Sequence, residues 1–452
     1  MKILVLNGSP KGKDSITYQT VRYLEKRFPS ETFSVLHVGQ RIRSIEKDFT
    51  EAEQALRSAD LLLFSYPVYT FLAPSQLHRF IELIKEHGVD LSGKYAAQIT
   101  TSLHFYDVTA HRFVRDNCDD LGLLYLDGLS ADMEDLLKPE GRKQAEDFFL
   151  HVRWCIENGV YLPPHDPKQS EQTPFAPAPL APLPAAEKTG DKRVVIVADG
   201  TEPPLKEMID AFTTRAPYRV DTVNLRDFPF AGGCLGCFRC AASGACVYKD
   251  GFDTFLREHI QTADATVYAF TIRDHSMGSL MKRFDDRQFC NGHRTVTMGK
   301  PVGYLIDGAL SEESNLSLLI EARAEVGGNY LAGVATDEHD PSAAIDRLVN
   351  NLGYAMETGY APPKSFYGVG GMKVFRDLIY QMRGLMREDH RFYKQHGFYD
   401  FPQKRKGRIV GMYLVGAMMR NKSIQKKIGS RMTEGMLLPY EKVLKEADEN
   451  EK

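Results

Sequence analysis

The chain has 452 residues, 43% of them hydrophobic and 26% charged, with a formal net charge of −3. This length predicts two or three domains, and the composition is that of a soluble globular protein, which excludes a disulfide miniprotein and a disordered chain and gives no indication of nucleic-acid binding. No apolar run reaches the roughly 20 residues of a spanning helix, and residues 1–10 have no signal-peptide pattern, so we expect a cytoplasmic protein without a transmembrane segment.

The first predicted elements recur in the second half of the chain. A buried strand is expected at residues 2–8 and again at 193–200, each followed by a helical stretch. Residues 75–80 and 279–284 also match, 204 positions apart. Continuous apolar strands alternating with amphipathic helices are typical of a parallel sheet covered on both faces. The sequence therefore predicts an internal duplication of a doubly wound α/β domain.

A proline-rich segment separates the two halves. Residues 163–184 contain eight of the 23 prolines, which predicts an extended, semi-rigid spacer. We place the boundaries as follows: an α/β domain at 1–162, a Pro-rich linker at 163–192, a second α/β domain at 193–363 and a basic helical extension at 364–452.

The loop after the first strand has the composition of an anion site. Residues 8–17, GSPKGKDSIT, offer glycines, hydroxyls and lysines at the expected start of a helix, where free N–H groups and the positive end of the helix dipole favour an anion. The loop matches neither GxxxxGK[ST] nor GxGxxG, and a terminal phosphomonoester such as that of FMN fits better. The alternative is a plain turn in which Ser15 or Thr17 caps the helix.

Two further segments should lie at the same edge of the first sheet. Residues 66–71 follow the third strand and could run along a flat ring, and residues 100–107 follow the fourth strand and offer polar groups to a ring edge. Ligands of doubly wound sheets bind at this carboxyl edge.

Together, GSPKGKDSIT, YPVYTFLAPSQLHRF and the TTS loop resemble the NAD(P)H-dependent FMN reductase branch of the flavodoxin-like superfamily over nearly all of residues 1–162. The resemblance implies two flavodoxin-like domains, FMN as the cofactor and NAD(P)H as a co-substrate that stacks on the flavin. It assigns to the FMN phosphate the residues Ser9, Lys11, Ser15 and Thr17. It assigns to the ribityl chain and ring the residues Pro67, Val68, Tyr69, Thr70 and Phe71, and to the ring edge Thr101 and Ser102.

His104 and His111 flank Asp107 and suggest a metal site, although a hydrogen-bonded or surface pair is the plainer interpretation. His104 lies near the expected flavin edge. It is our candidate catalytic residue, for substrate contact or proton supply.

Four of the seven cysteines, Cys234, Cys237, Cys240 and Cys246, lie within thirteen residues of the second half. Thiolates packed so tightly can hold an iron-sulfur cluster or zinc, but structural zinc usually uses two Cys-x2-Cys pairs farther apart. A [4Fe-4S] cluster, zinc and free or redox-active thiols all stay open. The remaining cysteines, Cys118, Cys155 and Cys290, are expected to be packing residues.

The segment FAGGCLGCFRCAASGACVYKDGF also resembles the cysteine motif of the iron-sulfur flavoproteins within the same family. This resemblance implies a [4Fe-4S] cluster on all four cysteines and a meeting of flavin and cluster across a subunit interface.

The two halves differ where the resemblance matters. The second loop, residues 199–206, contains two prolines together with Asp199 and Glu202, so we expect it not to hold FMN in the ordinary way. The first half has no cysteine at residues 39–47, where the cysteine segment would fall. We therefore expect a fused pseudo-dimer, with flavin on the first domain and cluster on the second.

The C-terminal extension is basic, with 19 Lys and Arg against 10 Asp and Glu over residues 361–452. From residue 370 an apolar helical face is expected to pack onto the chain's own domains or a second subunit. The apolar run 409–419 follows the basic residues 404–408, and Arg420, Lys422, Lys426 and Lys427 come after it. Such a segment could dock an acidic donor such as ferredoxin or lie on an anionic membrane surface.

The sequence thus predicts a flavin- and iron-sulfur-dependent oxidoreductase of the FMN reductase type. Electrons from NAD(P)H or ferredoxin would pass through FMN and a [4Fe-4S] cluster to a quinone, a small electrophile or a protein acceptor. The alternatives are an electron carrier without a small-molecule substrate and a zinc-stapled interaction protein. The donor, the acceptor and the oligomeric state, including a homodimer, stay open.

Overall fold

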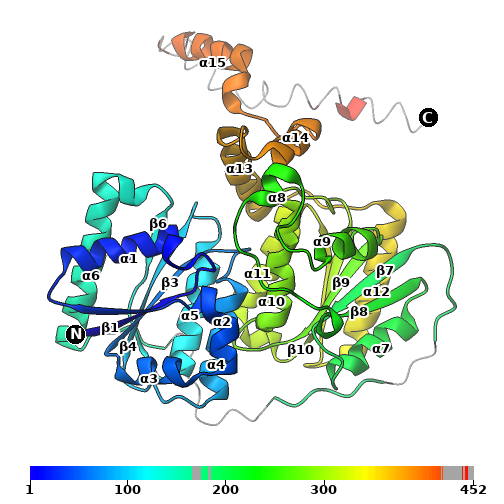
Figure 1. Cartoon of the computed structure of the whole chain (residues 1–452). Coiled ribbons are helices and arrows are strands. Elements are labelled where there is room, and N and C mark those ends of the chain that lie inside the picture. The colour runs from blue at the N-terminus through cyan, green and yellow to red at the C-terminus, as the bar shows by residue number, and fades with distance from the viewer. Residues whose placement is uncertain (165–174, 182–184, 419, 421–439, 441–442, 446–452) are drawn as a thin grey trace. The chain divides into compact units, whose positions relative to one another are not determined.

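The computed structural model describes the chain except residues 165–174, 182–184, 419, 421–439, 441–442 and 446–452. The described residues form two compact units, 1–392 and 393–452. Both α/β domains belong to the first unit, shown in Figure 1.

The first domain is a parallel sheet with the strand order β2-β1-β3-β4-β5, in which β6 also pairs with β4. Its strands are β1 (Lys2–Asn7), β2 (Thr32–Leu36), β3 (Leu61–Pro67), β4 (Tyr95–Ser102), β5 (Leu124–Tyr125) and β6 (Leu129–Asp132). Its helices are α1 (Ile16–Arg27), α2 (Val38–Lys47), α3 (Thr50–Ser58), α4 (Ser75–Glu86), α5 (Asp107–Asp120) and α6 (Pro139–Asn158).

The second domain repeats this arrangement with the parallel order β11-β10-β9-β7-β8. Its strands are β7 (Arg193–Ala198), β8 (Arg219–Asn224), β9 (Ala265–Thr271), β10 (Pro301–Asp307) and β11 (Tyr330–Thr336). Its helices are α7 (Leu205–Arg215), α8 (Arg239–Ser243), α9 (Phe252–Phe255), α10 (Gly278–Arg287), α11 (Ser314–Gly327) and α12 (Pro341–Thr358). Both domains therefore have the flavodoxin-like order 2-1-3-4-5, and the predicted fold class and duplication are confirmed.

Alternation along the strands explains the layers. In β1, Ile3 and Val5 join the core under α1 and α6, whereas Leu4 and Leu6 face the opposite core, as the two-residue period of a strand requires. That opposite core is continuous with the second domain and includes Phe284 of α10. The two sheets thus share one central core, and α1 and α6 cover one outer face while α7 and α12 cover the other (Figure 1).

Helices α4 and α10 pack against each other with approximate two-fold symmetry. The backbone N–H of Ser75 donates to Oδ2 of Asp286 over 2.8 Å, and that of Ser279 donates to Oε1 of Glu82 over 2.6 Å. Each helix therefore caps the other's N-terminus with a carboxylate, and the two pairs are related by the 204-residue repeat. Reciprocal contacts of this kind are typical of a two-fold dimer interface, here within one chain.

The turn after the third strand is also repeated. Thr70 and Phe71 have φ angles of 42° and 71°, and Asp274 and His275, 204 positions later, have 52° and 62°. Non-glycine residues seldom adopt these left-handed angles. The duplication therefore preserves a strained turn as well as the strand order.

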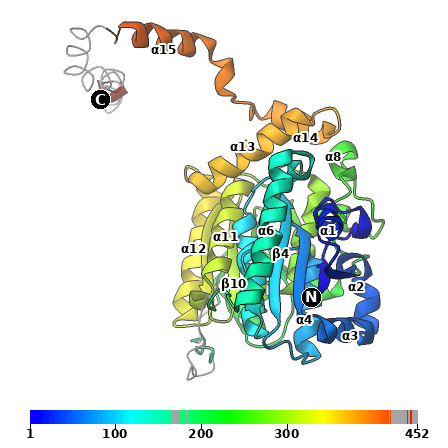
Figure 2. The same cartoon turned by 90° about the vertical axis from the view of Figure 1, so that its left-hand side faces the viewer.

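Helix α13 (Phe366–Gln381) packs on the first unit's own domains, as one of the sequence alternatives expected. Phe375 lies 4.4 Å from the ring of Phe105, and Figure 2 shows α13 across the end of α11. Arg376 of this helix is buried, and its Nε donates to Oδ1 of Asp377 over 2.8 Å.

Helix α14 (Arg387–Gln395) follows α13, and the second unit contains α15 (Lys406–Met418). The apolar side chains of α15, among them Met412 and Tyr413, are exposed. Three of the basic residues predicted after the apolar run, Lys422, Lys426 and Lys427, lie outside the described residues. None of the helices in the described part of the chain has the length and apolar content needed to cross a membrane.

Candidate functional site

The loop after β1 is held in shape by Asn7. The Asn7 amide donates to the carbonyl of Gly12 over 2.9 Å, and its Oδ1 accepts from the N–H of Ser9 over 3.1 Å. Gly12 has a φ of 56°, which favours glycine. Helix α2 packs so closely on the loop that a Cβ at Gly39 would collide with the carbonyl of Gly8.

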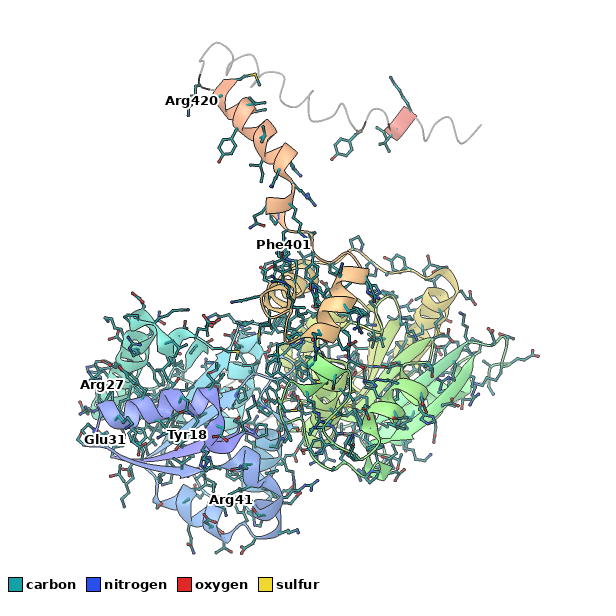
Figure 3. The ribbon with its side chains drawn as sticks, turned by 45° about the horizontal axis from the view of Figure 1, so that its top comes forward. Tyr18, Arg27, Glu31, Arg41, Phe401 and Arg420 are labelled. Carbon is teal, nitrogen blue, oxygen red and sulfur yellow. The ribbon has the colours of Figure 1, made fainter. Side chains whose placement is uncertain are left out.

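The N-terminus of α1 carries two buried hydroxyl side chains, those of Ser15 and Thr17. Ser15 occupies the N-cap position, but its hydroxyl makes no capping bond within the described residues. The Thr17 hydroxyl is buried and lacks a hydrogen-bond partner in the described part of the chain. Burying such a group unpaired costs about 1–3 kcal/mol. A bound phosphate would satisfy it, so this end of α1, flanked by the α2 that carries Arg41 (Figure 3), fits FMN better than a plain capped turn.

The loop 67–71, expected to contact the flavin ring, is fixed by the second domain. Lys282 donates from Nζ to the Tyr69 carbonyl over 2.8 Å and contacts Oγ1 of Thr70 at 2.6 Å. The Lys282 ammonium also pairs with Asp286, and both side chains are 0% exposed. Asp286 accepts from Thr70 Oγ1 over 2.9 Å as well. The left-handed turn of the first domain thus depends on a buried ion pair of the second.

One cavity of about 380 Å³ brings the predicted cofactor residues together. It is lined by all eleven residues assigned to FMN and by all four cysteines of the cluster: Ser9, Lys11, Ser15, Thr17, Pro67, Val68, Tyr69, Thr70, Phe71, Thr101, Ser102, Cys234, Cys237, Cys240 and Cys246. The structure therefore joins at one site what the sequence places on two domains.

The cysteine segment of the second domain packs directly on the first domain. The Arg43 guanidinium bonds the carbonyl of Ala231, and the Gln76 amide donates to the carbonyl of Cys234 over 3.4 Å. Gly236 lies so close to Tyr69 that a Cβ there would collide with the Tyr69 hydroxyl. The cysteines are therefore held against the loop expected to carry the flavin ring.

Arg287 anchors the other side of this segment. Its guanidinium makes two bonds of 2.8 Å to the Asp250 carboxylate and one of 2.9 Å to the carbonyl of Gly232. The same group lies 4.5 Å from the ring centre of Tyr248, within cation–π range. Arg287 is buried, and its bonds to Asp250 and Gly232 fix the fold of the cysteine segment from within.

The cysteines differ in their surroundings. Burial raises the pKa of Cys234, and it raises that of Cys240 to about 11 and that of Cys290 to about 12. The N–H of Gly236 donates to Sγ of Cys234 over 3.4 Å. Cys290, expected to be a packing residue, is buried but also lines the cavity. Over the described residues, no group of three or more His, Cys, Asp or Glu side chains is arranged to hold a metal ion.

In the second domain, charged side chains fill the space over the loop that follows the first strand, β7. Oε2 of Glu202 accepts from the N–H of Thr201 over 3.1 Å, and the Glu202 carboxylate pairs with Arg226. Arg226 also donates to the Asp199 carbonyl over 3.0 Å. A carboxylate and a guanidinium thus occupy the space over Gly200, where the first loop offers room for a phosphate.

His104 is not placed on the cavity. Among the described lining residues are its neighbours Leu103 and Phe105, whereas the His104 side chain is 56% exposed and lies 3.1 Å from Asp107. His111 bonds Thr100 Oγ1 at 2.7 Å. The two histidines are therefore engaged with separate polar partners.

Sequence reasoning missed Lys282, Arg287 and Arg323, which bind or line the site from the second domain. No local signal marks them, because their partners lie in distant segments of the chain. Only the internal repeat could have indicated Lys282, because this residue aligns with His78 of the first domain.

Residues 1–114 match the sequence model of the family described as NADPH-dependent FMN reductase. No curated protein sequence matched the chain.

Several solved structures are similar to one third of the chain. An FMN-dependent NADH-azoreductase from Bacillus anthracis in complex with FMN shows 16% identity and a TM-score of 0.28, covering 33% of this chain and 98% of its own. The NAD(P)H:(acceptor) oxidoreductase FerB from Paracoccus denitrificans shows 19% identity and a TM-score of 0.29, covering 36% and 99%. The NAD(P)H:quinone oxidoreductase from Methanothermobacter marburgensis shows 14% identity and a TM-score of 0.26, covering 36% and 98%.

Proposed function

We propose that this chain is an FMN-dependent oxidoreductase whose single redox site lies between its two flavodoxin-like domains. The match of residues 1–114 to NADPH-dependent FMN reductases supports the cofactor and the reaction class. The observation that carries the proposal is the common cavity, which the eleven FMN residues line from the first domain and the four cysteines line from the second.

The first domain would bind FMN through two sets of groups. Ser9, Lys11, Ser15 and the unpaired Thr17 hydroxyl would hold the phosphate at the start of α1, where the helix dipole also favours it. Residues 67–71 would lie along the ribityl chain and ring, with Thr101 and Ser102 at the ring edge. Bound FMN supplies hydride transfer chemistry.

The chain's own residues position and enclose that chemistry. Lys282 and Asp286 fix the backbone carbonyl of Tyr69 and the side-chain hydroxyl of Thr70, so the ring surface is set before FMN arrives. The cysteine segment covers the same side, and Phe238 lies 5.6 Å from the Lys11 ammonium. The exposed His104 contacts Asp107 rather than the cavity, and we give it no step in the reaction.

The four cysteines would hold a [4Fe-4S] cluster after drawing closer together than they lie here, where no three described His, Cys, Asp or Glu side chains are grouped to hold a metal ion. Their soft thiolates suit iron and sulfide, and the Gly236 N–H to Cys234 Sγ bond is of the kind that stabilises a ligating sulfur. Because Cys234 and Cys240 have raised pKa values, loading the cluster would release protons. Zinc and redox-active thiols are the competing states of the same four residues.

Electrons would enter from NAD(P)H or ferredoxin and leave to a quinone, a small electrophile or a protein acceptor. An electron carrier is the second candidate function, favoured by the basic residues Lys404, Arg405 and Arg408 of the second unit, which suit an acidic protein partner.

The test is an absorption spectrum of anaerobically purified protein, with flavin, iron, sulfide and zinc measured on the same sample and NAD(P)H oxidation followed with and without a quinone. One FMN with about four irons per chain and quinone-dependent NAD(P)H oxidation are expected. Cofactor reduction by ferredoxin without NAD(P)H turnover would favour the carrier. Zinc without flavin or iron would refute the proposal.

A further inference from the structure

Helix α15 presents a contiguous set of apolar side chains to solvent. Every residue of this helix except Gly411 is exposed, and Tyr413 and Leu414 are 77% and 62% exposed. Side chains project from it on several sides between Phe401 and Arg420, as Figure 3 shows. Contiguous apolar surface is rare on proteins in water and marks a place where a partner binds.

The apolar side chains of α15 are not confined to one face. Ile409 and Val410 are followed, after one glycine, by the unbroken run MYLV at 412–415. Successive residues of a helix point about 100° apart, so these positions encircle it. A groove on a folded protein would contact one side of the helix and leave the others in water. A lipid surface, into which such a helix sinks by roughly 5–10 Å, contacts most of a cylinder about 10 Å wide.

The charge around α15 has a single sign. Residues 401–433 contain nine Lys and Arg and no Asp or Glu. Five of the nine lie beside the apolar run and are exposed: Lys404, Arg405, Lys406, Arg408 and Arg420. Their side chains are long enough to bring the charges to phosphate groups while the apolar residues between them leave water. Basic clusters beside an apolar helix are typical of proteins that bind anionic lipid.

The length of α15 sets its orientation on such a surface. Its 13 residues span about 20 Å, which is less than the roughly 30 Å of a hydrocarbon core. Basic residues lie at both ends, and placing either end inside the core would be costly. A helix that lies along the surface keeps both ends among the headgroups while its apolar side chains enter the acyl boundary.

We propose that α15 and its flanking basic residues bind the surface of an anionic lipid bilayer, with the helix parallel to the membrane plane. The ligand is a layer of phosphate-bearing headgroups over acyl chains, and attachment is reversible. An acidic protein would suit the same charges but not apolar side chains on every side of the helix. The proposal is independent of the proposed function, because lipid binding requires neither flavin nor cluster.

Co-flotation of the full chain with vesicles tests the proposal. One set of vesicles contains phosphatidylcholine alone, and the other also contains phosphatidylglycerol at about one third of the lipid. The chain should bind the second set at least about 10-fold more tightly than the first, and this binding should weaken at high salt because salt screens the charges. Equal binding to both sets, or binding to neither, would overturn the proposal.

Two variants separate the charges from the apolar contact. Arg405→Gln, Lys406→Gln and Arg408→Gln together should weaken vesicle binding about 100-fold, since each basic residue near an anionic surface contributes roughly fivefold. Tyr413→Ser combined with Leu414→Ser should weaken it at least about 10-fold, because apolar area is no longer removed from water. All five positions are exposed, so neither variant should disturb folding.

Each variant has a matched control elsewhere on the surface. Lys26→Gln, Lys47→Gln and Arg347→Gln together remove three exposed charges from the two α/β domains, and Leu137→Ser removes an exposed apolar side chain. Both controls should bind vesicles like the natural chain. Equal losses in a variant and its control would show that net charge or general surface properties govern binding, and would refute the proposal.

An acidic protein partner gives a different result in the same experiments. Binding of a ferredoxin that the triple charge variant abolishes, without binding to anionic vesicles, would assign α15 to a protein partner instead. Vesicle binding that the double variant of Tyr413 and Leu414 leaves unchanged would also overturn the proposal, because charge alone would then account for it.

Discussion

The two halves of this chain have the same fold but differ in the side chains at the carboxyl edge of each sheet. After the first strand, one half has a loop with an unpaired Thr17 hydroxyl, and the other has a loop closed by Glu202 and Arg226. After the third strand, the same left-handed turn holds Phe71 in one half and His275 in the other. Phe71 lines the cavity, whereas His275 bonds carboxylates.

This difference shows how a duplicated fold can divide one site between its copies. The symmetric helix caps at Ser75 and Ser279 hold the halves together, so each half is free to lose what the other supplies. The loop proposed to bind the FMN phosphate lies in the first half, and the cysteine segment lies in the second.

The largest effect is expected from a charge in the first loop. Ser15→Glu buries a carboxylate where the FMN phosphate would lie, because Ser15 is only 2% exposed. Two like charges at one buried site repel strongly, so we expect flavin retention to fall at least about 100-fold, or roughly 3 kcal/mol. The measurement is the flavin content per folded chain.

The matched control is Thr201→Glu in the second loop, which should leave the flavin content unchanged. Iron should stay in Ser15→Glu, and Cys237→Ala should show the reverse pattern. Normal flavin content in Ser15→Glu would contradict the assignment of this loop.

The reciprocal helix caps should differ in strength. Asp286→Ala leaves the buried Lys282 without its partner, and breaking such a pair costs about 3–5 kcal/mol. Its counterpart Glu82 is 13% exposed, so Glu82→Ala should cost only about 1–2 kcal/mol. Chemical denaturation measures both.

Because Lys282 also holds Tyr69, Asp286→Ala should weaken flavin binding as well. Lys282→Met combined with Asp286→Leu removes both charges and should recover most of the stability but not the flavin affinity. Equal losses for the two caps would contradict the asymmetry.

The interface should weaken at alkaline pH through His275. Burial lowers the pKa of His275, but its hydrogen bonds to Asp120 and Glu313 outweigh this and raise it to about 10. A raised folded-state pKa stabilises fully below the unfolded value, near 6.5, and this contribution is lost as the pH rises through 10. We therefore expect the free energy of unfolding to fall over that window.

His275→Gln cannot carry the charge, so its stability should change less between pH 7 and 10 than that of the natural chain. Parallel stability curves for the two proteins would show that His275 is not charged at this interface.

The smallest effect concerns the closed loop. Burial raises the pKa of Asp199 to about 7, so the stability associated with its neutral form is present below about pH 3.8 and is lost as the pH rises through 7. Asp199→Asn should therefore stabilise the protein at pH 8 and not at pH 4. Thermal unfolding at the two pH values measures this, and a gain at both would point to another cause.

Much of this arrangement could be predicted from the sequence. The buried strands at 2–7 and 193–198 have an apolar pattern that only a doubly covered sheet explains, and the repeat implied the two-fold contact. The FMN and cysteine segments are local motifs, so the sequence alone indicates fifteen residues that the structure places on one cavity. The expectation of a pseudo-dimer, with flavin on one domain and the cluster on the other, also implied that the two segments would lie close together.

The rest depends on contacts that no local pattern encodes. In the sequence, Lys282 and Asp286 have the pattern of ordinary helix residues. In the structure they contact Thr70, which lies more than 200 positions away. The sequence places His104 near the expected flavin edge, but its exposed side chain contacts Asp107 and is not among the described residues that line the cavity.

The most direct test of the split between the halves is the FMN stoichiometry of the whole chain after reconstitution with excess FMN. The account predicts one FMN per chain in the natural protein, none in Ser15→Glu and one in Thr201→Glu. Two FMN per chain, or FMN retained in Ser15→Glu, would contradict it.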